Sequence, residues 1–201
     1  MEQLRQSTKR PRAARAPAQR PSQILDAAAR VLLRDGLAKA TIDDIAADAG
    51  LGKGTVYEYF GSKTELFTAL RARYTNDTLA AGMAAVEQLP HAPAIQQIQR
   101  FIAGMFEFAV ATTELLGLLF HDAGIQEQDE LEPIKAALLD LVRAGVESGE
   151  LAVADPQFSV EFLLHGLHGV MEASLTRDHH SPQVLQQVDE ILVAVLHPVH
   201  P

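Results

Sequence analysis

Residues 41–60, TIDDIAADAGLGKGTVYEYF, constrain the fold of this chain more than any other segment, because they contain two short helical patterns broken at a glycine. Thr41 is a suitable N-cap, and Asp44 three residues later completes a capping box. Apolar residues then recur at helical spacing on one face: Ile42, Ile45, Ala46 and Ala49. Gly50 can take the left-handed conformation common at helix C-termini. The pattern predicts a short helix, a sharp turn and a second short helix.

In the second helical pattern, Val56 and Phe60 lie four positions apart as core anchors. Two short helices with this spacing are typical of a helix-turn-helix, whose second helix enters the major groove of DNA. Just downstream, Ser62 and Glu65 form another capping box, and Lys63 lies where its charge and the helix dipole both attract phosphate. The expected DNA-binding residues are those that can offer charge, a hydroxyl or close backbone approach to the duplex: Thr41, Gly52, Lys53, Gly54, Thr55, Tyr57, Tyr59 and Lys63.

The run from about Gln23 to Tyr74 resembles the DNA-binding domain of TetR-type transcriptional regulators. Four motifs carry the resemblance, in this order: ILDAAARVLLRDG, TIDDIAADAG, KGTVYEYF and SKTEL. The sequence departs from the family pattern at Gly52, where a Ser or Thr commonly caps the recognition helix, and glycine offers no hydroxyl to phosphate. The resemblance implies an all-α fold, with an N-terminal three-helix helix-turn-helix DNA-binding domain followed by a larger helical ligand-binding and dimerisation domain.

The net charge of −9 is divided unevenly along the chain. Residues 1–75 hold 13 Lys and Arg against 8 Asp and Glu, whereas residues 76–201 hold 4 against 18. We expect residues 1–20 to be a disordered basic arm, residues 21–75 the DNA-binding domain, and the remainder the ligand-binding and dimerisation domain. Two interpretations of the arm stay open: it tracks phosphates or enters a minor groove, or it is a solubilising tail.

Apolar periodicity beyond residue 76 predicts long amphipathic helices. The last of them follows Ser181-Pro182 and carries an apolar stripe: Val184, Leu185, Val188, Ile191, Leu192 and Val195. The resemblance implies a homodimer through the two C-terminal helices, and we expect Leu192 to lie in that subunit interface. A single small helix-turn-helix buries too little surface to select one DNA site. A twofold dimer buries more and can select a palindromic site.

The middle of the second domain is the expected site of a small-molecule effector, because its helices are apolar and carry aromatic and Met side chains. The candidate pocket residues are Phe101, Met105, Phe108, Leu116, Phe120, His121, Phe162, His165, Leu167 and Met171. The alternative for each is ordinary core packing, which also places aromatic and Met residues at helical spacing.

Two histidines, His165 and His168, lie on one helical stripe with Glu161 and Glu172, and His121 can approach it. Three of these residues are candidate metal ligands, namely His121, His165 and His168, although no metal and no cofactor is expected. The alternative is a polar seam at the dimer interface or the pocket rim.

An enzyme is not expected. The run from Gly50 to Thr55 does not fit a phosphate-binding P-loop, because Gly54 separates Lys53 from the hydroxyl residue. Metal-assisted hydrolysis at the histidine stripe is the enzymatic alternative.

We therefore expect a ligand-responsive repressor that a small apolar effector releases from a palindromic double-stranded DNA operator. The alternative is a ligand- or metal-responsive activator or a nucleoid-associated sensor. The chain has no cysteine, and its longest strongly apolar run, Leu115 to Phe120, is too short to span a bilayer. We expect a cytoplasmic protein without a membrane partner.

Overall fold

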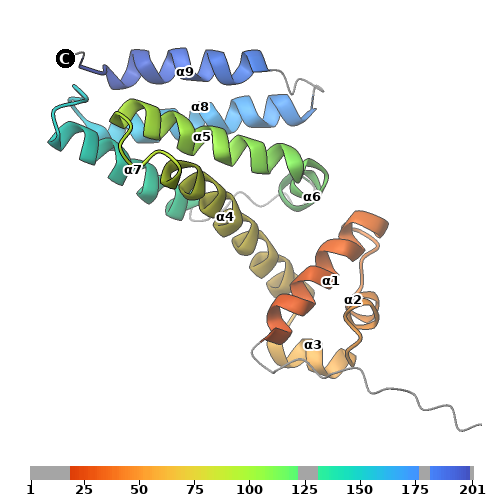
Figure 1. Cartoon of the computed structure of the whole chain (residues 1–201). Helices are drawn as coiled ribbons and strands as arrows, with labels where there is room; N and C mark the ends of the chain where they lie inside the picture. The colour runs from red at the N-terminus through yellow and green to blue at the C-terminus, as the bar shows by residue number, and fades with distance from the viewer. Residues whose placement is uncertain (1–18, 122–130, 177–181, 200–201) are drawn as a thin grey trace, which may run out of the picture.

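The computed structural model describes residues 19–121, 131–176 and 182–199, and their regular structure is helical apart from one isolated β-bridge. An N-terminal group contains α1 (Arg20–Asp35), α2 (Ile42–Ala49), α3 (Lys53–Tyr59) and the start of α4 (Lys63–Glu87). The following elements are α5 (Ala94–Ala111), α6 (Thr113–Leu116), the π-helix η2 (Gly117–His121), α7 (Glu132–Glu147), α8 (Pro156–Thr176) and α9 (Pro182–Leu196). Figure 1 shows the long helix α4 connecting the small group to the layered larger one. The predicted all-α fold is confirmed.

Two separate hydrophobic cores hold the chain together. The first joins α1 to α4, with Ile24, Ile45 and Val56 fully buried in it. The second lies between α5, α7, α8 and α9. Leu115 of α6 and Leu119 of η2 are buried in the first core, although they are distant from it in sequence. The α6–η2 segment is therefore packed as part of the N-terminal group.

Helix α4 belongs to both cores. Leu66 and Leu70 lie in the first core, and Val86 lies in the second. The domain boundary expected after residue 75 falls inside this continuous helix. Asn76 does not end it, because an asparagine within a helix costs only a few tenths of a kcal/mol. The division into domains stays a prediction, and α4 runs from one group into the other without a break.

Two glycines allow α4 and α5 to cross at close range. A Cβ atom on Gly82 would lie 2.8 Å from the ring of Phe101, and one on Gly104 would lie 2.7 Å from the carbonyl oxygen of Ala81. Such contacts are too short for any side chain, so the crossing requires glycine on both helices. Phe101 is completely buried against this crossing.

A sharp bend follows α5. The hydroxyls of Thr112 and Thr113 donate hydrogen bonds back to the carbonyls of Phe108 and Val110, each at 2.8 Å. Among the described residues, no single helix is long and apolar enough to cross a membrane; α5 and residues 113–119 pass that test only as a pair bent by 84°. The bend is what directs α6 toward α1.

The C-terminal segment is anchored to the turn between α7 and α8. The Val199 amide donates to the Glu150 carbonyl at 2.8 Å, and the Ala152 amide donates to the His197 carbonyl at 3.0 Å. These bonds hold α9 in place over α5. Leu192 is 0% exposed within the chain's own core, so the expectation that it lies in a subunit interface is wrong. Val188 and Leu192 of its stripe face the chain's own core, whereas Ile191 of the same stripe is 50% exposed.

Candidate nucleic-acid interface

Local hydrogen bonds build the turn between α2 and α3. The Thr41 hydroxyl oxygen accepts a hydrogen bond from the Asp44 amide at 3.2 Å, which caps α2. Gly50 has φ 67° and ψ 33°, the left-handed conformation, and the next amide, of Leu51, donates to the Ala46 carbonyl at 2.9 Å. The predicted N-cap and glycine turn are confirmed.

Helix α3 presents one face to the core and the other to solvent. Val56 and Phe60 are buried, whereas Tyr57 is 44% exposed. Gly52 and Gly54 are exposed as well, and a Cβ atom at either position would meet nothing within 4 Å. Neither glycine has a positive φ, so the chain's own fold does not require glycine there. The outer face of α3 is therefore open to a close external partner.

The expected phosphate-binding lysines both have internal partners. Lys53 is ion-paired with Asp43 of α2 at 2.8 Å, and the hydrogen bond to that carboxylate raises the pKa of Lys53. Lys63 donates to the Leu37 carbonyl at 3.0 Å, and its ammonium lies 5.5 Å from the centroid of the Phe67 ring. Each lysine must exchange a partner to reach phosphate.

Tyr59 differs from its expected position. It is half-buried and packs against the first core. The physical reason is helical spacing: Tyr59 follows Val56 by three positions and so shares its face. Tyr59 is therefore not free on the outer face of α3, and its contact with DNA stays a prediction, as do those of the exposed Thr41 and the half-buried Thr55.

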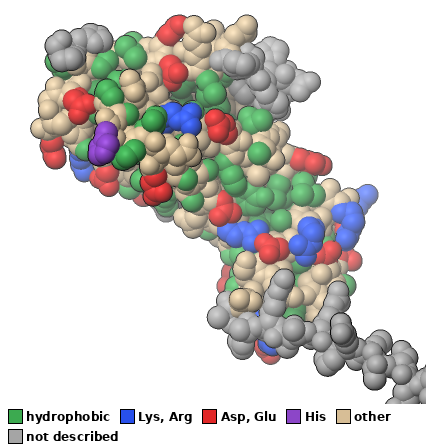
Figure 2. Space-filling view, in the orientation of Figure 1, with side chains coloured by type: hydrophobic (Ala, Val, Ile, Leu, Met, Phe, Trp, Pro, Cys, Tyr) green, Lys and Arg blue, Asp and Glu red, His purple; other side chains and the backbone are tan. Residues whose placement is uncertain are grey.

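The charge of the folded N-terminal group is balanced. Residues 21–75 contain seven Lys and Arg and seven Asp and Glu, so the basic excess lies in residues 1–20. Several cations are paired within the fold: Arg30 with Asp48, Arg34 with Asp35 and Arg73 with Asp26, each at 2.7 Å. Figure 2 shows Lys and Arg side chains interspersed with Asp and Glu on this part of the molecule. The predicted arm falls almost wholly on residues 1–18, outside the described residues.

The described residues of the predicted effector pocket are divided between the second core and the surface. Phe101, Met105 and Leu167 are buried in the second core, where they pack against other side chains. Phe108 contacts Tyr74, with ring centroids 6.0 Å apart, and so joins α5 to α4. Leu116 and Met171 are half-buried. The side chains of Phe120 and His121 lie outside what the structure describes.

Two pocket candidates on α8 point outward. Phe162 is 59% exposed and His165 is exposed, whereas Val160 and Leu163 occupy the inward face. Placing Phe162 and His165 in a pocket of this chain is therefore wrong. Because α8 is apolar on most of its circumference, periodicity alone does not identify its inward side.

The histidine stripe has ordinary partners. The Lys135 ammonium of α7 forms an ion pair with the Glu161 carboxylate at 2.6 Å, and its hydrogen bond to that carboxylate lowers the pKa of Glu161. The His165 ring nitrogen Nδ1 donates to the Glu161 carbonyl at 2.8 Å. Within the described part of the chain, no group of three or more His, Cys, Asp or Glu could hold a metal ion. Glu161 takes part in the polar seam between α7 and α8.

Two cavities lie elsewhere. Both are grooves open to solvent: one, of about 390 Å³, lies along the contact of α1 with α6 and η2, and the other, of about 350 Å³, lies between α5 and α9. Sequence reasoning missed both because each is formed by helices that are distant along the chain. For the groove beside α1, the signal in the sequence was Gly117, a residue without a side chain within an apolar run.

Known proteins place this architecture in a family. Residues 24–70 match the model of bacterial regulatory proteins of the tetR family. The HTH-type transcriptional repressor SCO4008 of Streptomyces coelicolor is 32% identical over 158 residues, which cover 76% of this chain and 78% of that protein. The chain belongs to the TetR family. The predicted resemblance is confirmed, as is the class of DNA-binding, helix-turn-helix transcription regulation.

Other TetR-family relatives extend the match beyond the helix-turn-helix. The regulator TtgR of Pseudomonas putida is 28% identical over 145 residues, 65% of this chain and 69% of that protein. Among solved structures, the fold resembles FadR of Bacillus subtilis in complex with stearoyl-CoA, with a TM-score of 0.72 and 20% identity over 88% of this chain and 99% of that one. At this identity, the structural likeness describes the fold.

Proposed function

We propose that this TetR-family protein is a homodimeric repressor that binds a palindromic operator through α3 and leaves it when a small molecule binds. The observation that carries the proposal is the outer face of α3, where two exposed glycines have no role in the chain's own packing. Glycine within a short helix costs stability relative to alanine. A backbone that must approach DNA closely accounts for that cost.

The side chains around these glycines suit a duplex. The Tyr57 hydroxyl can donate to phosphate or base edges, and Thr55 can do the same from the neighbouring turn. Lys53 and Lys63 add charge if phosphate displaces the Asp43 carboxylate and the Leu37 carbonyl. Phosphate carries a full negative charge, so the exchange from a neutral carbonyl is favourable for Lys63.

An exposed apolar face supports the homodimer. On α8, Phe158 is 69% exposed and precedes Phe162 by one helical turn. On α9, Ile191 is 50% exposed. Gly166 and Gly169 continue the α8 face without side chains, and a Cβ atom at either would meet nothing within 4 Å. Large apolar groups beside open glycines suit close packing against another helix, here the same face of a second copy.

The support for regulation by a small apolar effector comes from related proteins. SCO4008 is named a repressor, and the FadR structure holds stearoyl-CoA. Activation is the second candidate function, because a relative, FasR of Mycolicibacterium smegmatis, 27% identical over 119 residues, is named an activator. A reporter gene placed behind the selected operator separates the two, because deleting a repressor raises expression and deleting an activator lowers it.

Selection of bound sequences from a random DNA pool tests the proposal. We expect an inverted repeat whose half-sites are about one helical turn, or a multiple of it, apart. The variant Tyr57→Phe should retain the fold and bind the selected sequence more weakly, because it loses one hydroxyl on the outer face of α3. Enrichment of no sequence, or of a single half-site by a monomer, would contradict operator binding by a dimer.

A further inference from the structure

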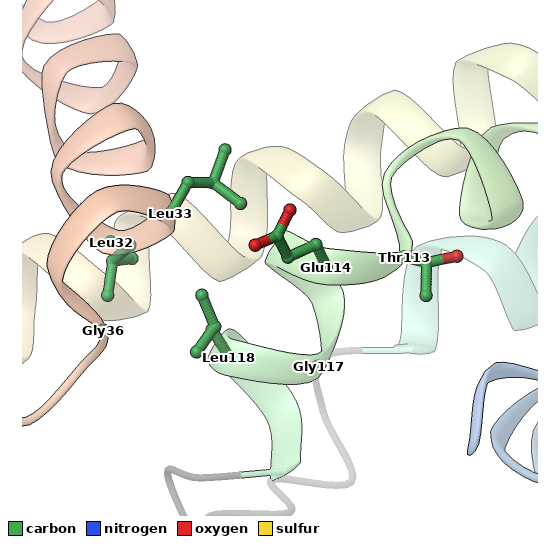
Figure 3. Close-up of a pocket in the computed structure, with 7 residues that line it drawn as sticks. All are labelled: Leu32, Leu33, Gly36, Thr113, Glu114, Gly117 and Leu118. Atoms are coloured by element: carbon green, nitrogen blue, oxygen red, sulfur yellow. The ribbon is translucent and has the colours of Figure 1, made fainter.

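We infer that the cavity between α1 and the α6–η2 segment is a binding site for a small cationic amphiphile, and that its occupancy changes DNA affinity. Figure 3 shows Leu33, Glu114 and Leu118 extending into this space from opposite sides. The inference rests on the proposed function and names a site for its effector. None of the residues predicted for the effector pocket lines the cavity.

The dimensions and walls of the cavity fit such a ligand. Its volume of about 390 Å³ lies in the range of small-molecule sites, about 300 to 1,000 Å³. Leu32 and Leu33 of α1 and Leu118 of η2 supply apolar walls. A hydrocarbon chain lying in this open groove can cover these side chains on one side and displaces no packed side chain.

One charged group on the lining sets the ligand's sign. Glu114 is exposed on α6, and across the described ranges its carboxylate has no hydrogen bond or ion pair. The neighbouring hydroxyl of Thr113 is already bonded to carbonyls of α5. An ammonium group beside Glu114 would gain an ion pair, whereas a carboxylate would be repelled. An alkylammonium combines the charge and the hydrocarbon that these walls favour.

The position of the cavity connects its occupancy to DNA binding. Leu115 and Leu119, on the same segment as Glu114 and Leu118, are buried in the first core with the helix-turn-helix. A ligand in this groove contacts both α1 and the α6–η2 segment, so its affinity depends on how far apart they lie. Its affinity therefore differs between two positions of α3. A ligand alters DNA affinity only through such a difference.

Gly117 offers a way to fill the cavity by mutation. It lines the cavity with helical φ of −55° and ψ of −47°, and a Cβ atom there would meet nothing within 4 Å. Gly117→Leu should fold and occupy the space that the ligand needs. Gly117→Ala is the matched control, because it adds the Cβ atom and leaves most of the cavity open.

Titration of the full-length protein with octylammonium, 1-octanol and octanoate, followed by calorimetry, tests the site. We expect octylammonium to bind more tightly than octanol and octanoate least. Glu114→Gln should weaken octylammonium binding about two- to fivefold, the range for an exposed ion pair, and leave octanol unchanged. Asp140→Asn, which removes an exposed carboxylate on α7 away from both grooves, is the control. Gly117→Leu should abolish binding and Gly117→Ala should preserve it.

Two outcomes would overturn the inference: no binding of octylammonium at millimolar concentration, or binding that Gly117→Leu leaves unchanged. Operator affinity is measured separately on the same samples. If octylammonium lowers operator affinity, the operator must lower octylammonium affinity by the same factor. A protein that binds its operator but not octylammonium would refute the site alone. A protein that binds octylammonium but no DNA would refute the proposed function alone.

Discussion

The helix-turn-helix and the α8–α9 layer are both helical, but they differ in what defines their surfaces. In the first, Thr41, Gly50 and Ser62 fix the helix ends through bonds to neighbours three or four residues away. In the second, α8 and α9 carry apolar residues on both inward and outward faces, with Leu163 buried and Phe162 exposed. The comparison shows that local caps specify geometry, whereas an apolar residue acquires a role only from what packs against it.

The largest expected effect separates core from surface on α9. Leu192→Glu should lower the free energy of unfolding by roughly 4 kcal/mol or more, because it places a carboxylate among fully buried side chains. Ile191→Glu, one position away and half exposed, should leave the unfolding of each subunit nearly unchanged. Urea denaturation at several protein concentrations checks this and isolates the contribution of association. Equal destabilisation by both variants would mean that α9 is packed in a different register.

The next effect concerns the outward face of α8. Phe162→Glu should weaken dimerisation by about 2 kcal/mol or more, since an exposed aromatic at a subunit interface is a typical hot spot. Sedimentation equilibrium measures the dissociation constant. Val110→Glu, which changes a similarly exposed apolar residue on α5, is the control. An unaltered dimer in the Phe162 variant would remove α8 from the proposed interface.

Gly54→Ala should have opposite effects on stability and on DNA binding. Alanine favours the helix by about 1 kcal/mol and meets no neighbour, so the melting temperature should rise. Operator affinity should fall about tenfold if the duplex approaches this backbone. Fluorescence anisotropy with labelled operator and thermal unfolding give the two quantities. Gly50→Ala is the contrast, because its positive φ makes alanine destabilising.

Lys63→Ala should lower operator affinity by about 1 kcal/mol and reduce the salt slope by about one, as loss of one phosphate contact requires. The bond to Leu37 gives the same residue a second role, which is positioning α4 against the turn after α1. If only that role exists, the melting temperature will fall while the salt slope stays constant. Binding at three salt concentrations together with a melting curve distinguishes the two.

The smallest effect should come from Asp43→Asn. Removing this carboxylate frees Lys53 and takes a negative charge away from the N-terminus of α3, so operator affinity should rise two- to fivefold. The salt slope should increase by up to one. Asp140→Asn on α7 removes an exposed carboxylate of the larger group and should change neither quantity. A fall in affinity would show that the Lys53–Asp43 pair positions α3 for DNA.

The elements that could be predicted from the sequence are those specified by residues a few positions apart. The caps at Thr41 and Ser62, the glycine turn and the buried Val56 and Phe60 were all predicted, because short-range hydrogen bonds and helical spacing are visible in neighbouring letters. The all-α class and the family followed from the same motifs.

The positions of apolar and charged residues that have several possible partners could not be predicted before the folded arrangement of the helices was known. Leu192 turned into the chain's own core, and Phe162 turned out to solvent. Lys53 pairs with Asp43, ten residues away, and Leu115 packs in a core formed mainly by the N-terminal helices. Each outcome depends on which distant helix offers the partner, because burial and ion pairing are interactions between surfaces that meet only after folding.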